Sequence, residues 1–295
     1  MNIISFFSYK GGSGRSSLAY NTLPYIARNL NASPQHPLLI LDMDIDSAGL
    51  SLLFDDLVKD TDLFVQTVFE TSIPGGIIGR DICPDIADHP FFKNLTGIGE
   101  VYNMEEKSIL FLPARTKGNR SIAADSYTLN GERLDRVVSL CEEYDCCGMI
   151  FDCPTGDQMT ANASLRLSDK VVVVMRITSQ FRDGTYMYLK DFDAKAGTDK
   201  QLIIVPNAVP RDKISLNGMP YNYDAVKAEI VENIKDNVQR HKVSFHMFED
   251  GRFGVPEVIR FKFKEDILFS LEERTADEDA ALAMYEEVAD AICPR

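Results

Sequence analysis

The sequence predicts an α/β fold: a doubly wound, mainly parallel sheet with helices on both faces, in a single domain spanning residues 1–295. Three observations lead to this prediction. Short apolar runs rich in β-formers recur along the chain, and stretches with helical spacing separate them. The runs are continuous rather than alternating, which is typical of strands buried on both faces. The length permits one large domain or two smaller ones, and neither a repeat nor a low-complexity linker divides the chain, which favours one domain.

The expected elements follow in chain order. Strands are predicted at residues 3–8, 38–42, 109–113, 148–152, 171–175 and 202–206. Helices are predicted from residue 16 onward and at 132–144, 221–241 and 276–292. In the 132–144 stretch, apolar side chains recur at helical intervals, at Leu134, Val137, Val138 and Cys141. Such alternation implies right-handed crossovers between parallel strands. Residues 71–106 are rich in Gly and Pro, which indicates an irregular insertion.

The charge of the chain limits its partners. Its 31 Lys and Arg stand against 45 Asp and Glu, a formal charge of −14. This overall field disfavours binding to nucleic acid or to anionic membranes. Between residues 251 and 264, basic side chains are interleaved with Phe. That pattern fits either a nucleic-acid contact or a strand with one buried and one solvated face. We favour the strand, so DNA is the less favoured partner.

The sequence also predicts the compartment. No window contains 18 uninterrupted apolar residues, and the amino terminus lacks the basic region of a secretory signal. The stretch at 276–292 is acidic, which argues against a basic membrane-targeting helix. None of the six cysteines forms a C-x-x-C pair. We expect a cytoplasmic protein with reduced thiols and no membrane partner.

The strongest motif is a glycine-rich loop at residues 8–17, SYKGGSGRSS, between a predicted strand and a predicted helix. Glycines permit backbone conformations that let N–H groups converge on phosphate oxygens at the positive end of a helix. A glycine-rich turn without a ligand is the alternative, but three glycines, two cations and paired serines in this context favour nucleotide binding. The expected binding residues are Gly11, Gly12, Ser13, Gly14, Arg15, Ser16 and Ser17. Arg15 would supply charge to the β- and γ-phosphates, Ser16 a hydroxyl to Mg²⁺ and Ser17 a hydroxyl to the α-phosphate.

Two predicted strands end in carboxylates that should face this loop. The first continues through Asp42, Asp44 and Asp46, which share a face if the extended conformation continues. A calcium loop is excluded, because its sixth and twelfth positions lack the required Gly and Glu. The strand at 148–152 ends in Asp152, the pattern of a Walker B strand whose aspartate holds Mg²⁺ through a water.

Together these motifs resemble the deviant Walker A P-loop ATPases, the family of ParA-type partition and MinD-type positioning proteins, whose loop reads K-G-G-x-G-K-[ST]. Lys10 matches the signature lysine of that loop, and Arg15 replaces its second lysine, which makes a KGGxGR variant. Asp44 matches the catalytic aspartate, although the family commonly continues with Pro-Gln where this chain has Ile45-Asp46. The resemblance spans nearly the whole chain, but outside these motifs it is soft.

The resemblance implies roles for individual residues. Lys10 would reach the nucleotide of the other subunit in a homodimer formed on ATP binding, and Asp44 would orient or deprotonate the attacking water. Gly156 and Asp157 would begin a loop that senses the γ-phosphate. Asn207, at the end of a predicted strand, would read the adenine edge, with a plain turn asparagine as an equally favoured interpretation.

Two functions from different classes remain. The first is a dimeric ATPase, switched by ATP and Mg²⁺, that hydrolyses ATP slowly with Lys10, Asp44 and Arg15 as catalytic residues and signals to a partner protein. Its metal residues would be Ser16, Asp44 and Asp152. The alternative is an ATP-binding regulatory scaffold with little or no hydrolysis, which Arg15 and the missing Pro-Gln motivate. A bacterial tyrosine kinase shares these motifs, but the last seventy residues lack a tyrosine cluster.

Overall fold

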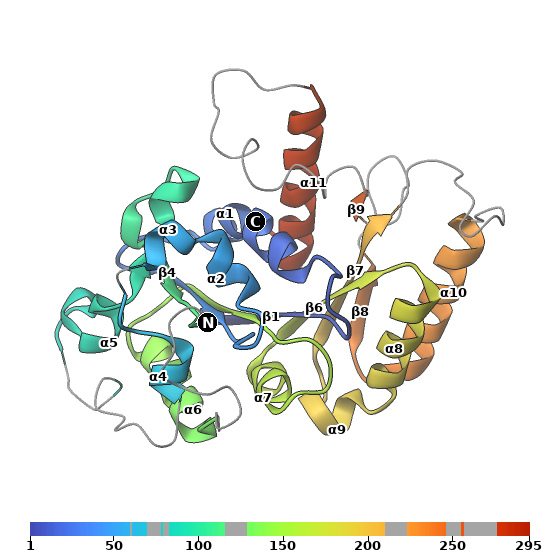
Figure 1. The fold of residues 1–295 in the computed structure, drawn as a ribbon, viewed down its shortest axis with the longest axis horizontal. Helices are drawn as coiled ribbons and strands as arrows, with labels where there is room; N and C mark the ends of the chain where they lie inside the picture. Colours follow the sequence, from blue (N-terminus) through green and yellow to red (C-terminus); the bar gives the residue numbers. More distant parts are fainter. Residues whose placement is uncertain are drawn as a thin grey trace.

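The computed structural model of the chain describes residues 1–59, 61–69, 78, 83–115, 129–209, 223–245, 255–256 and 276–295. Its centre is one sheet with the strand order β3-β4-β2-β5-β1-β6-β7-β8, and β9 pairs with β7 (Figure 1). Every strand pair in it is parallel except β3 with β4. The predicted doubly wound, mainly parallel α/β fold is therefore confirmed.

The strands are β1 Asn2–Phe7, β2 Leu38–Asp42, β3 Thr96–Gly97, β4 Ile109–Leu112, β5 Gly148–Asp152, β6 Lys170–Arg176, β7 Gln201–Val209, β8 Lys242–Phe245 and β9 Val255–Pro256. The six predicted strands are all present. Sequence analysis missed the short strands β3 and β8, whereas β9 lies within the stretch at 251–264 for which a strand was favoured. β8 lies beside β7 and alternates exposed with half-buried residues, so it lacks the continuous apolar run that identified the inner strands.

The helices are α1 Arg15–Asn29, α2 Gly49–Leu53, α3 Asp55–Val58, α4 Val65–Phe69, α5 Pro90–Lys93, α6 Gly131–Glu143, α7 Met159–Leu167, α8 Ser179–Lys190, α9 Phe192–Ala196, α10 Tyr223–Asn237 and α11 Ala276–Ile292. Short 3₁₀ turns occur at Ile86–Asp88, Gly99–Tyr102 and Glu106–Ser108. α11 has the predicted bounds, whereas α10 ends at Asn237, four residues before the predicted end.

Two hydrophobic cores lie on the two faces of the sheet. Ile3 and Phe7 of β1 contribute to the core shared with α6 to α10, whereas Ile4 and Phe6 contribute to the core shared with α1, α2 and α11. Figure 1 shows these two sets of helices on opposite sides of the sheet. The inner strands therefore bury both of their faces, which is the reason for their continuous apolar runs.

The predicted irregular insertion at 71–106 and the predicted strand-like stretch at 251–264 are only partly described. Within the insertion, residues 83–106 form α5, β3 and short 3₁₀ turns, and 71–77 and 79–82 lie outside the described residues. Most of the stretch at 251–264 also lies outside them, so the choice between the favoured strand and the less favoured contact with nucleic acid stays untested there. None of the helices in the described ranges is both long and apolar enough to cross a membrane.

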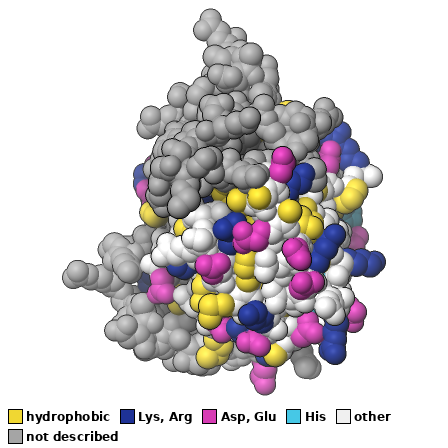
Figure 2. All heavy atoms as spheres, turned by 90° about the vertical axis from the view of Figure 1, so that its right-hand side faces the viewer, with side chains coloured by type: hydrophobic (Ala, Val, Ile, Leu, Met, Phe, Trp, Pro, Cys, Tyr) yellow, Lys and Arg dark blue, Asp and Glu magenta, His cyan; other side chains and the backbone are white. Residues whose placement is uncertain are grey.

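The surface that includes α8 and α10 carries mixed charge. Figure 2 shows Lys and Arg side chains interspersed with Asp and Glu on the described part of the side that lies at the right in Figure 1. Charges of both signs at close spacing largely cancel at a distance. The described part of this face therefore offers no large field of one sign to a polyanion.

Candidate functional site

The glycine-rich loop connects β1 to α1, in the strand–loop–helix context that the sequence predicted. Gly12 has φ 76° and Gly14 has φ 87°, a left-handed region that glycine adopts readily. Gly14 is also the N-cap residue of α1. A Cβ atom added at Gly11 or Gly12 would meet nothing within 4 Å, so the loop faces open space there. The first N–H groups of α1 and the positive end of its dipole are directed to this side.

A cavity of about 400 Å³ opens above the loop. Its walls come from three segments that follow β1, β2 and β5. The lining residues are Ser8 and residues 11–17 of the loop and α1, Asp44, Asp46, Ser47, Gly49 and Leu53 after β2, and Thr155 and Gln158 after β5. Because these strands are parallel neighbours, their carboxyl ends meet at one edge of the sheet, where ligands of open α/β sheets bind.

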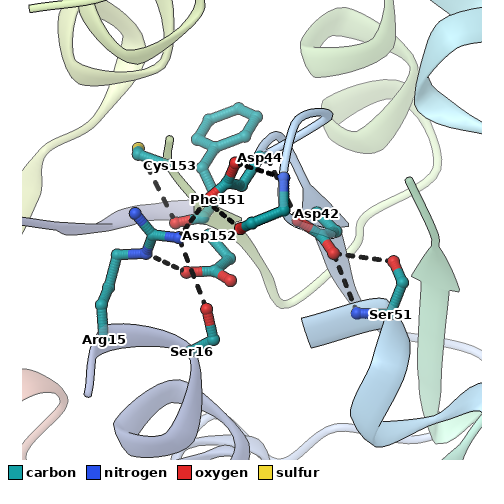
Figure 3. Close-up of polar contacts among 9 residues, drawn as sticks. Arg15, Ser16, Asp42, Asp44, Ser51, Phe151, Asp152 and Cys153 are labelled. Carbon is teal, nitrogen blue, oxygen red and sulfur yellow. Dashed lines mark hydrogen bonds and ion pairs between the residues drawn. The ribbon is translucent and has the colours of Figure 1, made fainter. Parts of the chain in front are cut away.

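Arg15 bridges two carboxylates at the base of this site (Figure 3). Its side chain is only 5% exposed, and its Nε lies 2.6 Å from Asp152 Oδ1 while Nη2 lies 2.8 Å from Asp44 Oδ2. Burial by itself would lower the pKa of the guanidinium, but the charges of Asp152 and Asp44 outweigh that effect and raise the pKa. Arg15 is therefore a permanent cation between two anions, and its guanidinium is directed at the carboxylates.

Asp152 and Asp42 occupy paired positions at the ends of β5 and β2. Both side chains are fully buried. Burial raises the pKa of Asp152, and the charge of Arg15 opposes that rise. Burial and the neighbouring charge of Asp152 raise the pKa of Asp42 to about 7. Asp42 accepts hydrogen bonds from the backbone N–H and the hydroxyl of Ser51 at 2.8 and 2.7 Å, so it connects β2 to α2.

The segment that carries Asp44 differs from the sequence prediction. The extended conformation ends at Asp42 and the chain turns at residues 45–47, so the three carboxylates do not share one face. Asp44 points to Arg15 and accepts hydrogen bonds from the backbone N–H and hydroxyl of Ser47, while Asp46 is exposed at the cavity wall. Ala48, the N-cap residue of α2, then has φ 47°, a strained value for a residue with a Cβ.

Asn207 lies against the loop. It is 6% exposed at the end region of β7, and its Nδ2 donates a hydrogen bond of 2.6 Å to the carbonyl oxygen of Ser13. A Cβ atom on Gly14 would lie 2.1 Å from this nitrogen, so Gly14 is required for the contact. The amide nitrogen of Asn207 thus holds the loop in this structure, and its reading of an adenine edge stays a prediction.

The remaining predicted residues are also near the loop. Ser16 and Ser17 lie in the first turn of α1 and line the cavity. Lys10 is partly buried in the turn after β1 and is not among the lining residues. Sequence analysis missed the lining residues Ser8, Thr155 and Gln158, although all three lie within a few residues of recognised motifs. Only the fold reveals that their side chains meet in one cavity.

Several oxygen atoms of the site suit Mg²⁺ bound together with a nucleotide phosphate. Asp152 Oδ2 is buried without a hydrogen-bond partner, and the hydroxyl of Ser16 and the carboxylate of Asp44 lie near the same Arg15 guanidinium. Hydroxyl and carboxylate oxygens suit Mg²⁺, which commonly takes its other ligands from phosphate and water. The described residues contain no cluster of three or more His, Cys, Asp or Glu suited to a metal. The donor set fits Mg²⁺ bound with a nucleotide, provided that Arg15 moves.

Comparison with known proteins gave matches of structure alone. No protein-family model and no curated protein sequence matches the chain. Among solved structures, MinD with Mg-ADP from Pyrococcus horikoshii OT3 is 16% identical, with a TM-score of 0.59 over 99% of this chain and 96% of that one. The MinC:MinD cell division complex of Aquifex aeolicus gives 16% identity and a TM-score of 0.59 over 100% and 96%. A putative plasmid partition protein of Borrelia burgdorferi B31 bound to AMPPNP gives 14% and 0.53 over 96% and 97%.

These matches of structure cover nearly the full length of the chain. Identities below one fifth carry the fold and not the activity. The chain therefore has the P-loop fold of the MinD and ParA-type ATPases.

Proposed function

We propose that the protein is a nucleotide-switched ATPase that binds ATP with Mg²⁺, dimerises in that state, hydrolyses ATP slowly and signals to a partner protein. The observation that carries this proposal is that the glycine loop and Asp44 line one cavity, with the buried Asp152 in contact with Arg15 of the same site. The fold adds support, since its solved neighbours include a MinD with Mg-ADP and a partition protein with AMPPNP. ATP as the nucleotide rests on that likeness.

In this proposal the loop and the first turn of α1 cradle the phosphates with their N–H groups. Ser17 contacts the α-phosphate. Arg15 leaves Asp44 and Asp152 and turns to the β- and γ-phosphates, so it exchanges one set of anions for another. This exchange makes the arginine a sensor of the nucleotide, because the phosphates compete with the two carboxylates for one cation.

Ser16, Asp44 and Asp152 would hold Mg²⁺, which when bound neutralises charge on the phosphate oxygens. Asp44 is then the group that orients the attacking water and accepts its proton. The water oxygen bonds to the terminal phosphorus as the bond from that phosphorus to the bridging oxygen breaks, which releases ADP and phosphate. The two hydrogen bonds from Ser47 fix the Asp44 carboxylate for this role.

Lys10 would act in the dimer. Lys10 does not line the cavity of its own subunit, so in this proposal its ammonium group contacts the nucleotide of the second subunit. The signature lysine of the motif that Lys10 resembles has that role. The proposed partner would read the closed dimer, for which the solved complex of MinC with MinD is a precedent. We propose that this partner is a protein and not a membrane.

The test is solution mass by light scattering with Mg²⁺ and ATP or ADP, combined with phosphate release. We expect twice the monomer mass with Mg²⁺ and ATP but not with Mg²⁺ and ADP. The dimer should persist longer in Asp44→Ala, because hydrolysis is blocked. Lys10→Ala should lose both ATP-dependent dimerisation and turnover. If Lys10→Ala retains both, the role given to Lys10 is wrong. A monomer under every condition contradicts the dimer, and absence of ATP binding contradicts the whole proposal.

One observation favours the second candidate, a regulatory scaffold that holds ATP without turnover. Arg15 occupies both carboxylates that hydrolysis would use, at 2.6 and 2.8 Å. If this bridge persists with ATP bound, neither carboxylate is available for the metal or the water. Single-turnover phosphate release separates the candidates: release that Asp44→Ala abolishes rules out the scaffold, and an ATP-stable dimer without release rules out the ATPase.

A further inference from the structure

Ser8 has a buried hydroxyl without a protein partner. The residue is 0% exposed, and its Oγ has no hydrogen-bond partner, yet it lines the cavity. Leaving a buried polar group unpaired is unfavourable, so a native protein that keeps one there has a reason for it. A ligand in the cavity would supply the missing hydrogen bond.

Other unpaired polar atoms lie in the same corner of the site. Arg15 Nη1 and Asp152 Oδ2 are also buried without partners. Arg15 contacts Asp152 directly. In the pairing of β1 with β5, Phe6 is opposite Asp152, and Ser8 follows Phe6 by two residues, so Ser8 is near the same carboxylate. The corner thus offers one donor, one acceptor and one hydroxyl that can do either, a set that suits phosphate oxygens and water.

The location of Ser8 identifies which end of a nucleotide it meets. Its carbonyl oxygen accepts a hydrogen bond of 3.1 Å from the N–H of Gly156, in the segment after β5. Asp152 ends β5 and Asp44 follows β2, both on one side of β1, whereas Asn207 lies on β7, on the other side. Ser8 is therefore at the end of the loop where the hydrolytic carboxylates lie, the end of the terminal phosphate.

We propose that the hydroxyl of Ser8 donates a hydrogen bond to the terminal phosphate of a bound nucleoside triphosphate and lets the site distinguish the triphosphate from the diphosphate. This assignment rests on the proposed function. Its physical basis is that a hydrogen bond to a charged phosphate is stronger than one between neutral groups. A diphosphate leaves the hydroxyl unpaired, as it is in the structure.

The experiment compares Ser8→Ala with wild type for affinity to AMPPNP and to ADP, each with Mg²⁺, by calorimetry on the full chain. AMPPNP keeps hydrolysis out of the measurement. We expect Ser8→Ala to weaken AMPPNP binding by about tenfold, because one charge-assisted hydrogen bond is lost, and ADP binding by less than about twofold. The ratio of the two affinities is the readout.

Ser5→Ala is the matched control. Ser5 is a serine of β1 that is also 0% exposed, but its hydroxyl pairs with Ser168 Oγ at 2.6 Å and it does not line the cavity. We expect Ser5→Ala to unfold at a lower temperature with an unchanged affinity ratio. Ser8→Ala should be at least as stable as wild type without nucleotide, since it removes an unpaired polar atom. A purely structural role for Ser8 would reverse that result.

The outcomes separate this assignment from the proposed function. If wild type binds AMPPNP and ADP but Ser8→Ala keeps the wild-type ratio, the assignment of Ser8 is wrong and the proposed function stands. If Ser8→Ala weakens both ligands equally, Ser8 shapes the loop and does not read the terminal phosphate. If wild type binds neither ligand, the proposed function fails and the assignment fails with it.

Discussion

The Nε atom of Arg15 lies 2.6 Å from Oδ1 of Asp152, and this contact joins the loop that should hold phosphate to the strand that should hold metal. The same guanidinium reaches Asp44 at 2.8 Å. Arg15 thereby takes the place that a divalent cation would have between the two carboxylates. In the function that we propose, Arg15 contacts Asp152 in the nucleotide-free site and leaves it when a nucleotide binds.

Removal of the Arg15 charge should destabilise the protein strongly. Arg15→Met leaves Asp44 and Asp152 buried without a counter-charge, so we expect a loss of roughly 3–5 kcal/mol in the free energy of unfolding by urea titration. Arg136→Met is the control: its pair with Glu143 at 2.6 Å is partly solvated, so it should lose less than about 1 kcal/mol. Equal losses in the two variants would show that the buried bridge contributes little.

Asp44 and Asp46 should differ in function although both line the cavity. Asp44→Asn removes the proton acceptor beside Arg15, so we expect phosphate release to fall by at least about a hundredfold. Asp46 is exposed, so Asp46→Asn should keep turnover within about threefold. A colorimetric phosphate assay measures both. Comparable losses would mean that the turn at 45–47 rearranges and that Asp46 shares the role.

Gly14→Ala should disrupt the loop. The new Cβ would lie 2.1 Å from Asn207 Nδ2, and φ 87° is strained for alanine, so Asn207 must move away from Ser13. We expect loss of ATP binding in calorimetry and a lower unfolding temperature. Gly131→Ala is the control, since it is at the start of α6 with open space around it and should be neutral or slightly stabilising. If Gly14→Ala still binds ATP, the contact between Asn207 and Ser13 is not needed for nucleotide binding.

Cys147 should react slowly with thiol reagents near neutral pH. Burial raises its pKa to about 12, which favours the neutral thiol, and the thiolate is the reactive form. Its alkylation rate should therefore rise about tenfold per pH unit through pH 8–11, since the thiolate fraction does so below the pKa. Mass spectrometry of iodoacetamide-treated protein measures the rate at this residue. A rate that levels off near pH 9 would contradict the raised pKa.

The inner strands and the strand–loop–helix context of the glycine loop could be predicted from the sequence alone, and so could the proximity of Asp44 and Asp152 to the loop. Inner strands of a parallel sheet are buried on both faces, so their apolar runs are continuous and visible in the sequence. The loop motif is also visible in the sequence, because each glycine is needed for the backbone conformation at its own position. Short elements such as β3 and α2 are too short to show a hydrophobic periodicity, and the alternation of exposed and half-buried residues in β8 is weak in the sequence.

Only the tertiary structure decided where the side chains point. Asp42, Asp44 and Asp46 alternate in the sequence, but the turn after β2 sends each to a different environment. Arg15 follows the motif of a phosphate ligand, yet it pairs with Asp152 at the end of β5 and with Asp44 in the segment after β2. Ser8 has no signal of its own in the sequence, and its unpaired hydroxyl exists only because β1, β5 and the loop enclose it. Partners distant in the chain set these orientations, and no local pattern records such contacts.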